Sequence, residues 1–235
     1  MSEYLLSTSG LTKQFGHHKA VNNVDLHVKK GAIYGFIGRN GAGKTTFLKM
    51  ISGLSKPTEG EIQMFGYRNE ELKNVRSRIS GLIEAPGIYG NMSAYHNLAI
   101  KCRLFGINDS KYIENILKIV GLSEVGKKKT KHFSLGMKQR LGIGLALVGE
   151  PDLLVLDEPI NGLDPQGIAE IRDMLLRLKE EQNMTIIISS HILEELSKIA
   201  THYGIIHNGS LIQELTREEL MTRCSERMEL TLDDP

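Results

Sequence analysis

The chain has few cysteines, almost no net charge and no long hydrophobic run, and each shortage excludes a class of protein. Cys102 and Cys224 are far apart, so they form neither a zinc-binding spacing nor a disulfide framework, and a reducing cytosol is the simpler setting. A net charge of +1 gives no overall basic field, so we expect no nucleic-acid partner. The longest apolar stretch, residues 141–148, is far shorter than the ~20 residues that cross a bilayer. We therefore expect no membrane span, although the chain could dock onto a membrane protein.

The two ends of the sequence carry weaker signals. Near the start, Ser7, Thr8 and Ser9 interrupt the apolar residues and no basic segment precedes them, so we expect no signal peptide. Near the end, residues 228–232 alternate like a strand shortly before the sequence stops at Pro235. We therefore expect the natural protein to continue further.

The hydrophobic pattern predicts alternating strands and helices on both sides of a helical stretch. The expected strands are residues 4–12, 21–28, 33–37, 61–65, 79–83, 153–156, 185–189 and 203–207. The expected helices are residues 44–52, 93–105, 110–120, 136–148, 166–181 and 192–199. This order indicates an α/β fold with a parallel sheet covered by helices. We expect one domain, with a core of about 1–84 and 150–215, a helical subdomain of about 85–149, and a segment 216–235 that begins an extension.

Residues 38–45, Gly-Arg-Asn-Gly-Ala-Gly-Lys-Thr, fit the phosphate-binding pattern G-x-x-x-x-G-K-[ST]. Glycines let backbone N–H groups approach phosphate oxygens, and the following helix directs its N-terminus at the anion. Lys44 would place its charge on the β- and γ-phosphates of ATP, and Thr45 would offer a hydroxyl to Mg²⁺. A buried strand before the loop and a helix after it favour this interpretation over a chance glycine turn. The residues expected to bind the nucleotide here are Gly38, Arg39, Asn40, Gly41, Ala42, Gly43, Lys44, Thr45 and Thr46.

Two carboxylates, Asp157 and Glu158, follow four apolar residues that read as a buried strand. The strand would carry them to its carboxyl end, where ligand sites of α/β folds lie. We expect Asp157 to hold Mg²⁺ through water and Glu158 to act as the general base on the attacking water. Taken alone, a capping pair at a strand end would be a competitive interpretation. Beside a phosphate-binding loop, a catalytic role is the better interpretation.

Several segments together resemble the ATP-binding cassette (ABC) ATPases. Residues 134–139, Ser-Leu-Gly-Met-Lys-Gln, resemble the signature sequence of that family, and residues 161–164, Asn-Gly-Leu-Asp, look like its D-loop. His191, which alone would be a helix-start histidine without a task, matches the family's switch histidine, and Phe15 matches the aromatic residue that stacks on adenine. The order and spacing of these motifs agree over nearly the whole chain.

The resemblance implies a P-loop NTPase (RecA-like) core with an antiparallel β subdomain and an inserted α-helical subdomain. It also implies a head-to-tail dimer with a second ABC ATPase subunit, in which each ATP lies between one phosphate loop and the other signature helix. Ser134, Gly136 and Asp164 would then contribute to nucleotide binding. An integral membrane permease would hold the pair at the cytoplasmic face of the membrane as peripheral subunits.

The chain also departs from the family pattern. Leu135 replaces a glycine of the signature, Arg39 stands where many cassettes have proline, and Ile160 where many have threonine. Glu84 stands where most have glutamine; a carboxylate can accept from water or bind Mg²⁺ but cannot donate as an amide does. We therefore expect Glu84 to be both catalytic and metal-binding. With the Pro-Gly-Ile-Tyr of residues 86–89, it resembles the cassettes of bacitracin-resistance and lantibiotic-immunity exporters, which expel antimicrobial peptides with a separate permease.

Residues 84–94 and the adjacent helices are expected to form the permease docking surface, because Ile88, Tyr89, Met92 and Tyr95 fit an apolar contact patch. One alternative is an ABC ATPase that acts on ribosomes or DNA without a membrane partner. The basic connector 127–131 is the feature that points to nucleic acid, and a solvated charge run explains it better. Another alternative is the ATPase of a nutrient importer, against which only Glu84 argues.

Overall fold

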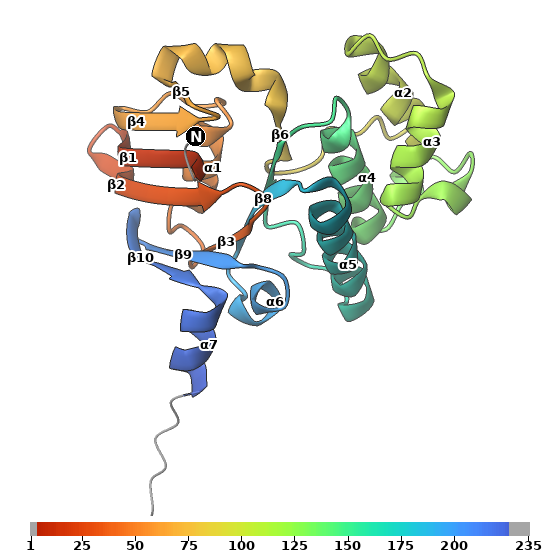
Figure 1. The fold of residues 1–235 in the computed structure, drawn as a ribbon. Coiled ribbons are helices and arrows are strands. Elements are labelled where there is room, and N and C mark those ends of the chain that lie inside the picture. The colour runs from red at the N-terminus through yellow and green to blue at the C-terminus, as the bar shows by residue number, and fades with distance from the viewer. Residues whose placement is uncertain (1–3, 226–235) are drawn as a thin grey trace, which may run out of the picture.

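The computed structural model describes residues 4–225, which form two β-sheets with helices on both sides of the larger one (Figure 1). The larger sheet has the strand order β10-β9-β3-β8-β7-β6, and its strands from β9 to β6 run parallel. Its strands are β3 (Ile33–Ile37), β6 (Ile79–Leu82), β7 (Leu153–Asp157), β8 (Thr185–Ser190), β9 (His202–His207) and β10 (Ser210–Thr216). β3, which precedes the phosphate-binding loop, lies between β8 and β9, so the loop opens at the centre of the sheet.

The smaller sheet is antiparallel and has the order β2-β1-β4-β5. Its strands are β1 (Tyr4–Phe15), β2 (His18–Lys29), β4 (Glu59–Met64) and β5 (Tyr67–Arg68). β1 and β2 are longer than the sequence predicts, because their pairing continues to Phe15 and His18 and leaves Gly16 and His17 as the turn.

The inserted helical part lies on the opposite side of the larger sheet from the antiparallel sheet (Figure 1). It comprises α2 (Ala94–Leu104), α3 (Ser110–Ile119) and α4 (Leu135–Leu147), with short 3₁₀ turns at Ser123–Val125 and Thr130–His132. The side chains of Ser93, Asp109 and Ser134 cap the three helices by accepting backbone N–H bonds. The other helices are α1 (Lys44–Ile51), α5 (Pro165–Gln182), α6 (Leu193–Ser197) and α7 (Arg217–Ser225). The predicted α/β class, with an antiparallel sheet and an inserted helical part, is confirmed.

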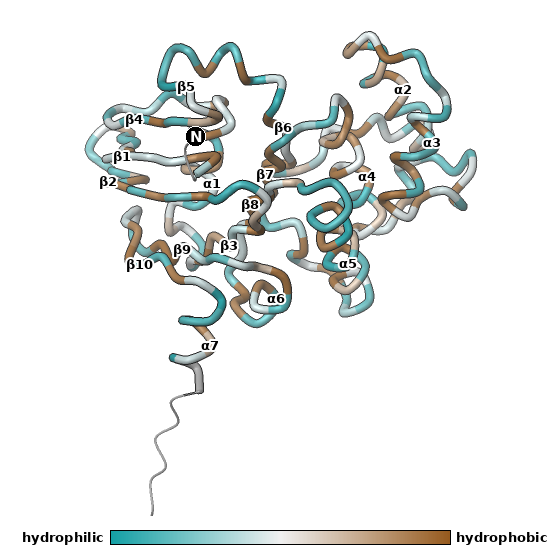
Figure 2. Tube along the Cα trace, viewed as in Figure 1, coloured by the Kyte–Doolittle hydropathy of each residue, from teal (hydrophilic) through white to brown (hydrophobic). Residues whose placement is uncertain are grey.

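Two hydrophobic cores lie on the two faces of the larger sheet. Along β7, Leu154 and Leu156 pack into the core shared with α2 to α5, while Leu153 and Val155 pack into the core shared with α1 and the antiparallel sheet. This two-sided burial explains why β7 and β8 read as continuous apolar runs rather than alternating ones. Figure 2 shows the same hydrophobic strands at the centre of the molecule.

Apart from the two-residue strand β5 and the short 3₁₀ turns at Ser123–Val125 and Thr130–His132, three elements have no counterpart in the sequence prediction: the 3₁₀ segment Asn69–Arg78, β10 and α7. The 3₁₀ segment is almost entirely polar, and only Leu72 and Val75 are buried, so its hydrophobic pattern is weak. β10 forms a hairpin with β9 through Asn208 and Gly209, both with positive φ, and Asn-Gly is the strongest short hairpin signal in a sequence. The predicted strand at residues 228–232 lies outside the described residues.

Glu214 on β10 joins the two sheets. Its carboxylate accepts hydrogen bonds from the backbone N–H of His27 on β2 at 2.9 Å and from the Tyr34 hydroxyl on β3 at 2.7 Å, and it also lies 2.9 Å from the His27 ring. Burial, with the neighbouring Glu214, raises the pKa of Tyr34 well above its ordinary value. The antiparallel sheet is thereby tied to the strand that leads into the phosphate-binding loop.

Candidate functional site

The loop between β3 and α1 has the backbone conformation that its glycines permit. Gly41 and Gly43 have φ of 79° and 104°, in the left-handed region. A Cβ at Gly43 would lie 2.3 Å from the carbonyl oxygen of Ala20, and one at Gly38 would lie 2.6 Å from that of Ile206. α1 begins at Lys44 with no side-chain cap, so its first N–H groups are available to an anion.

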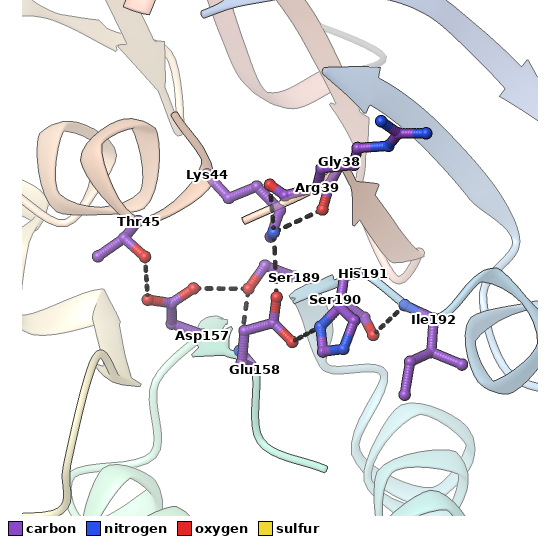
Figure 3. A network of polar contacts seen from close by, with 10 residues as sticks. All are labelled: Gly38, Arg39, Lys44, Thr45, Asp157, Glu158, Ser189, Ser190, His191 and Ile192. Carbon is purple, nitrogen blue, oxygen red and sulfur yellow. Dashed lines mark hydrogen bonds and ion pairs between the residues drawn. The ribbon is translucent and has the colours of Figure 1, made fainter. Parts of the chain in front are cut away.

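Lys44 is buried at the base of this loop and is 5% exposed. Its ammonium donates to the carbonyl oxygens of Gly38 at 2.6 Å and Arg39 at 3.2 Å. It also lies 3.0 Å from Glu158 Oε1, as an ion pair without hydrogen-bond geometry (Figure 3). The charge that the sequence assigns to phosphate is thus held by oxygens of the loop and of a carboxylate.

Thr45 and Asp157 meet across the gap between α1 and the end of β7. The Thr45 hydroxyl donates to Asp157 Oδ2 at 2.6 Å, and the Ser189 hydroxyl donates to Asp157 Oδ1 at 2.6 Å (Figure 3). Ser189 Oγ also accepts from the backbone N–H of Glu158 at 2.9 Å. A hydroxyl on the helix after the phosphate-binding loop, beside a carboxylate at the end of another strand of the sheet, is the kind of oxygen donor set that Mg²⁺ takes in nucleotide sites, so these residues fit that ion.

Glu158 lies between Lys44 and His191. Its Oε2 is 2.9 Å from His191 Nδ1, while its Oε1 faces Lys44. Its φ of 47° is in the left-handed region, which L-residues with side chains rarely adopt, and this conformation directs the carboxylate into the cluster. The structure therefore brings together five residues that the sequence singled out: Lys44, Thr45, Asp157, Glu158 and His191 (Figure 3).

Ser189 belongs to the same cluster, and sequence reasoning missed it. β7 and β8 are neighbours in the parallel sheet, and Asp157 pairs with Ser189 in their register. Ser189 is fully buried and bonds both carboxylate-bearing residues. The sequence does show a pair of serines, Ser189 and Ser190, at the end of a strand of β-branched residues. Their role could not be predicted, because it depends on the pairing of β7 with β8, which local sequence does not reveal.

Glu84 lies outside this cluster, in the segment after β6, and its side chain contacts the surface of α1. Its carboxylate accepts from the Lys49 ammonium at 2.5 Å, one helical turn after Thr45, and its side chain is 63% exposed. Its φ of 65° is also left-handed. Among the described residues, no hydrogen bond or ion pair joins Glu84 to Asp157 or Glu158.

Four predicted site residues, Phe15, Ser134, Gly136 and Asp164, lie apart from the cluster, and within residues 4–225 no hydrogen bond or ion pair links them to it. Phe15 is 56% exposed at the end of β1, with the Lys13 ammonium 5.1 Å from its ring centre. Ser134 accepts from the N–H of Met137 as the cap of α4, which leaves Gly136 in its first turn. Asp164 caps α5 by accepting from the N–H of Gly167 at 3.0 Å.

Leu135, the departure in the signature segment, packs beside the D-loop-like segment of the same chain. A Cβ at Gly162 would lie 3.3 Å from the Leu135 side chain, and one at Gly136 would lie 3.7 Å from Leu163. Leu135 is still 49% exposed. The side chain thus fills space between α4 and residues 161–164 while presenting part of its surface to solvent.

The predicted docking residues divide into exposed and packed ones. Tyr89 is 58% and Met92 is 39% exposed, whereas Ile88 and Tyr95 pack against the core of the helical part. In the part of the chain that the structure describes, no helix is both long enough and apolar enough to span a membrane.

Comparisons with known proteins agree with this geometry. Residues 21–161 match the family model described as ABC transporter. The bacitracin transport ATP-binding protein BcrA of Bacillus licheniformis is 47% identical over 233 residues, which are 98% of this chain and 76% of that protein. The lantibiotic transport ATP-binding protein SrtF of Streptococcus pyogenes is 43% identical over 210 residues, covering 89% of this chain and 90% of SrtF.

Solved structures give the same result for the fold. The cbiO1 protein of Clostridium perfringens, part of the ABC transporter complex cbiONQ, superposes with a TM-score of 0.85 at 26% identity, covering 95% of this chain and 92% of that one. A dimeric ATP-binding cassette in a post-hydrolysis state, bound to ADP and Pi, superposes with a TM-score of 0.79 at 25% identity over 90% of this chain and 98% of that one.

Proposed function

Since this chain belongs to the ABC transporter family as an ATP-binding subunit with ATPase activity, we propose that it powers the export of antimicrobial peptides through a separate membrane subunit. The observation that carries the proposal is the identity of 43–47% to bacitracin and lantibiotic transport ATP-binding proteins over almost the whole chain. The Glu84 stretch, which the sequence links to the same group of exporters, supports it.

Lys44 would bind the β- and γ-phosphates of ATP. A phosphate oxygen would replace Glu158 Oε1 as the anion beside the Lys44 ammonium, while the carbonyl oxygens of Gly38 and Arg39 hold that ammonium in place. Thr45 and Asp157 would hold Mg²⁺, which when bound neutralises charge on the phosphates. Nucleotide binding would therefore free Glu158 from its cation.

Glu158 would then orient the attacking water and accept its proton. His191, 2.9 Å away, would fix the carboxylate in that position, and Ser189 would fix both the Asp157 carboxylate and the Glu158 backbone. These two neighbours, Ser189 on β8 and His191 just after that strand, would hold the reacting groups in place, which favours catalysis because little reorganisation is needed.

A second cassette would complete the site. The N-terminus of α4, with Ser134 and Gly136, would meet the γ-phosphate bound to the opposite subunit, where its free N–H groups are attracted to the anion. Asp164 would hold the D-loop at this interface through its cap on α5, and Phe15 would stack on the adenine. In this arrangement Ser134, Gly136, Asp164 and Phe15, which contact nothing in the cluster among the described residues, would each lie at the nucleotide or at the interface between the two cassettes.

Glu84 would act on the water or the metal after leaving Lys49. We expect Glu84→Ala to lower ATP turnover by about 100-fold, at the lower end of what a catalytic acid or base contributes, with little change in ATP affinity. Lys49→Ala is the matched control, since it removes the ion pair and keeps the carboxylate. Steady-state ATPase assays and nucleotide titrations measure both. Equal losses in the two variants would assign the effect to the ion pair, and wild-type rates in Glu84→Ala would show that the carboxylate has no catalytic role.

The proposed function is tested by purifying the chain from its own cells in mild detergent and identifying its companions by mass spectrometry. A polytopic membrane protein should come with it, and cells lacking that pair should become sensitive to bacitracin or lantibiotics. Ribosomal or DNA-repair proteins without a membrane companion would overturn the export proposal and leave the ATPase chemistry intact.

The docking surface has a direct test in the same experiment. We expect the double variant Tyr89→Ala, Met92→Ala to bind ATP normally and to recover about tenfold less of the membrane subunit, because both exposed apolar side chains would be buried in the contact. The matched control is Leu54→Ala with Tyr67→Ala, two exposed apolar residues that lie outside the helical part. Undiminished recovery in the first variant would show that these residues are not in the interface.

A further inference from the structure

A groove of about 370 Å³ lies between the segment that follows β6 and helices α2 and α4. Leu82, Ile83 and Pro86 line one side, and Ile100, Leu104 and Leu145 line the other. α4 approaches closely here, since a Cβ at Gly142 would lie 2.8 Å from the side chain of Pro86. The groove is therefore mainly apolar, and α4 can approach Pro86 this closely because residue 142 is a glycine.

The rim of the groove is held rigidly by Asn97 on α2. The Asn97 side chain accepts from the backbone N–H of Tyr89 at 2.8 Å and donates to the Tyr89 carbonyl at 3.2 Å, so it pairs with the loop as a neighbouring strand would. The Thr130 hydroxyl donates to the same carbonyl at 2.9 Å. Tyr89 thus projects its exposed ring from a fixed backbone, and the groove exists before any partner binds.

One cation lies in this apolar groove. Of the described residues that line it, Lys101 is the only charged one. Its ammonium makes no hydrogen bond or ion pair with the described residues, and it lies over the Phe105 ring, 5.8 Å from the ring centre. Burial lowers the pKa of Lys101. Leaving a half-buried ammonium without an anion costs free energy that a carboxylate from outside would recover.

We propose that Lys101 forms an ion pair with an aspartate or glutamate on an apolar segment of the membrane subunit that docks in this groove. Leu104, Phe105 and Tyr89 are large and 81%, 49% and 58% exposed, so a docked segment would bury them and shield the pair from water. A shielded pair is stronger than a surface pair, and it selects partners because a neutral or basic residue at that point leaves Lys101 unpaired. The inference rests on the proposed function, since it names the chemistry of its partner.

The test uses the detergent purification with three variants. Lys101→Glu should lower the recovery of the membrane subunit by about tenfold or more, because the new carboxylate would face the carboxylate of the partner. Lys101→Met should lower the recovery less, because it removes the attraction without adding repulsion. Lys111→Glu, an exposed lysine in the first turn of α3, is the control and should recover the wild-type amount. ATP binding and thermal unfolding of the isolated variants should match those of the wild type.

Charge reversal in the partner identifies the residue. Each cytoplasmic Asp or Glu of the recovered membrane subunit is changed to Lys and tested with Lys101→Glu, and one such change should restore recovery. If the wild-type chain recovers its membrane subunit and Lys101→Glu recovers as much, the ion pair is refuted and the export proposal stands. If no reversal restores binding, the ion pair is equally refuted. If the wild type recovers no membrane protein, the proposed function fails first and the ion pair with it.

Discussion

Glu158→Gln should lower ATP turnover by about three orders of magnitude while ATP still binds. Glutamine keeps the size of the side chain and can still face His191, but it cannot accept a proton from water. It also removes the negative charge that lies 3.0 Å from Lys44, so phosphate no longer competes with a carboxylate for that cation. ATP affinity should therefore be equal to or higher than that of the wild type.

The same variant should accumulate as a dimer in the presence of ATP, because the nucleotide that joins the two proposed half-sites is no longer consumed. Single-turnover hydrolysis, nucleotide titration and light scattering with and without ATP measure the three effects. Glu114→Gln, on the exposed face of α3, is the matched control and should leave all three unchanged. Wild-type turnover in Glu158→Gln would refute its assignment as the base.

Lys44→Ala should abolish tight nucleotide binding, with an affinity loss of about 100-fold or more. The loss follows from removing a charged donor, since a hydrogen bond to a charged group is worth about 1.5–3 kcal/mol and Lys44 is expected to make more than one with the phosphates. In the structure three oxygens already hold its ammonium at the base of the loop, so no other side chain can easily substitute for it.

Isothermal titration with ATP and with ADP measures the loss for Lys44→Ala. Lys49→Ala, which removes an ammonium one turn along the same helix, controls for a general effect of charge on α1 and should bind ATP like the wild type. Thermal unfolding shows whether the variant is folded. We expect it to fold, because Glu158 would keep His191 as a partner when Lys44 is removed. Wild-type affinity in Lys44→Ala would mean that the loop does not bind nucleotide through this residue.

Local sequence is sufficient for much of the site. The glycines of residues 38–43, the lysine and threonine after them and the Asp-Glu pair after an apolar run each depend on near neighbours, and the structure places Lys44, Thr45, Asp157 and Glu158 within one network. The α/β class also follows from local periodicity, because strands buried on both faces and helices differ in length and pattern.

What sequence reasoning missed depends on contacts between distant segments. Ser189 is important because β8 lies beside β7, and the order of strands in a sheet is not a local property. The Glu84 carboxylate pairs with Lys49, 35 residues earlier, which no spacing rule predicts. Lys101 reads as an ordinary helix lysine until α4 and the segment after β6 are packed around it.

The backbone at Glu84 and Glu158, with φ of 65° and 47°, has a practical consequence for engineering this chain. A non-glycine residue in the left-handed region costs about 1 kcal/mol or more, and glycine or asparagine adopts it most readily. A search for thermostable variants would therefore favour replacement of both glutamates. The variants with the highest unfolding temperature would then lack the carboxylates that are proposed to act in ATP hydrolysis. Libraries for crystallisation or cryo-EM samples should keep positions 84 and 158 fixed and seek stability elsewhere.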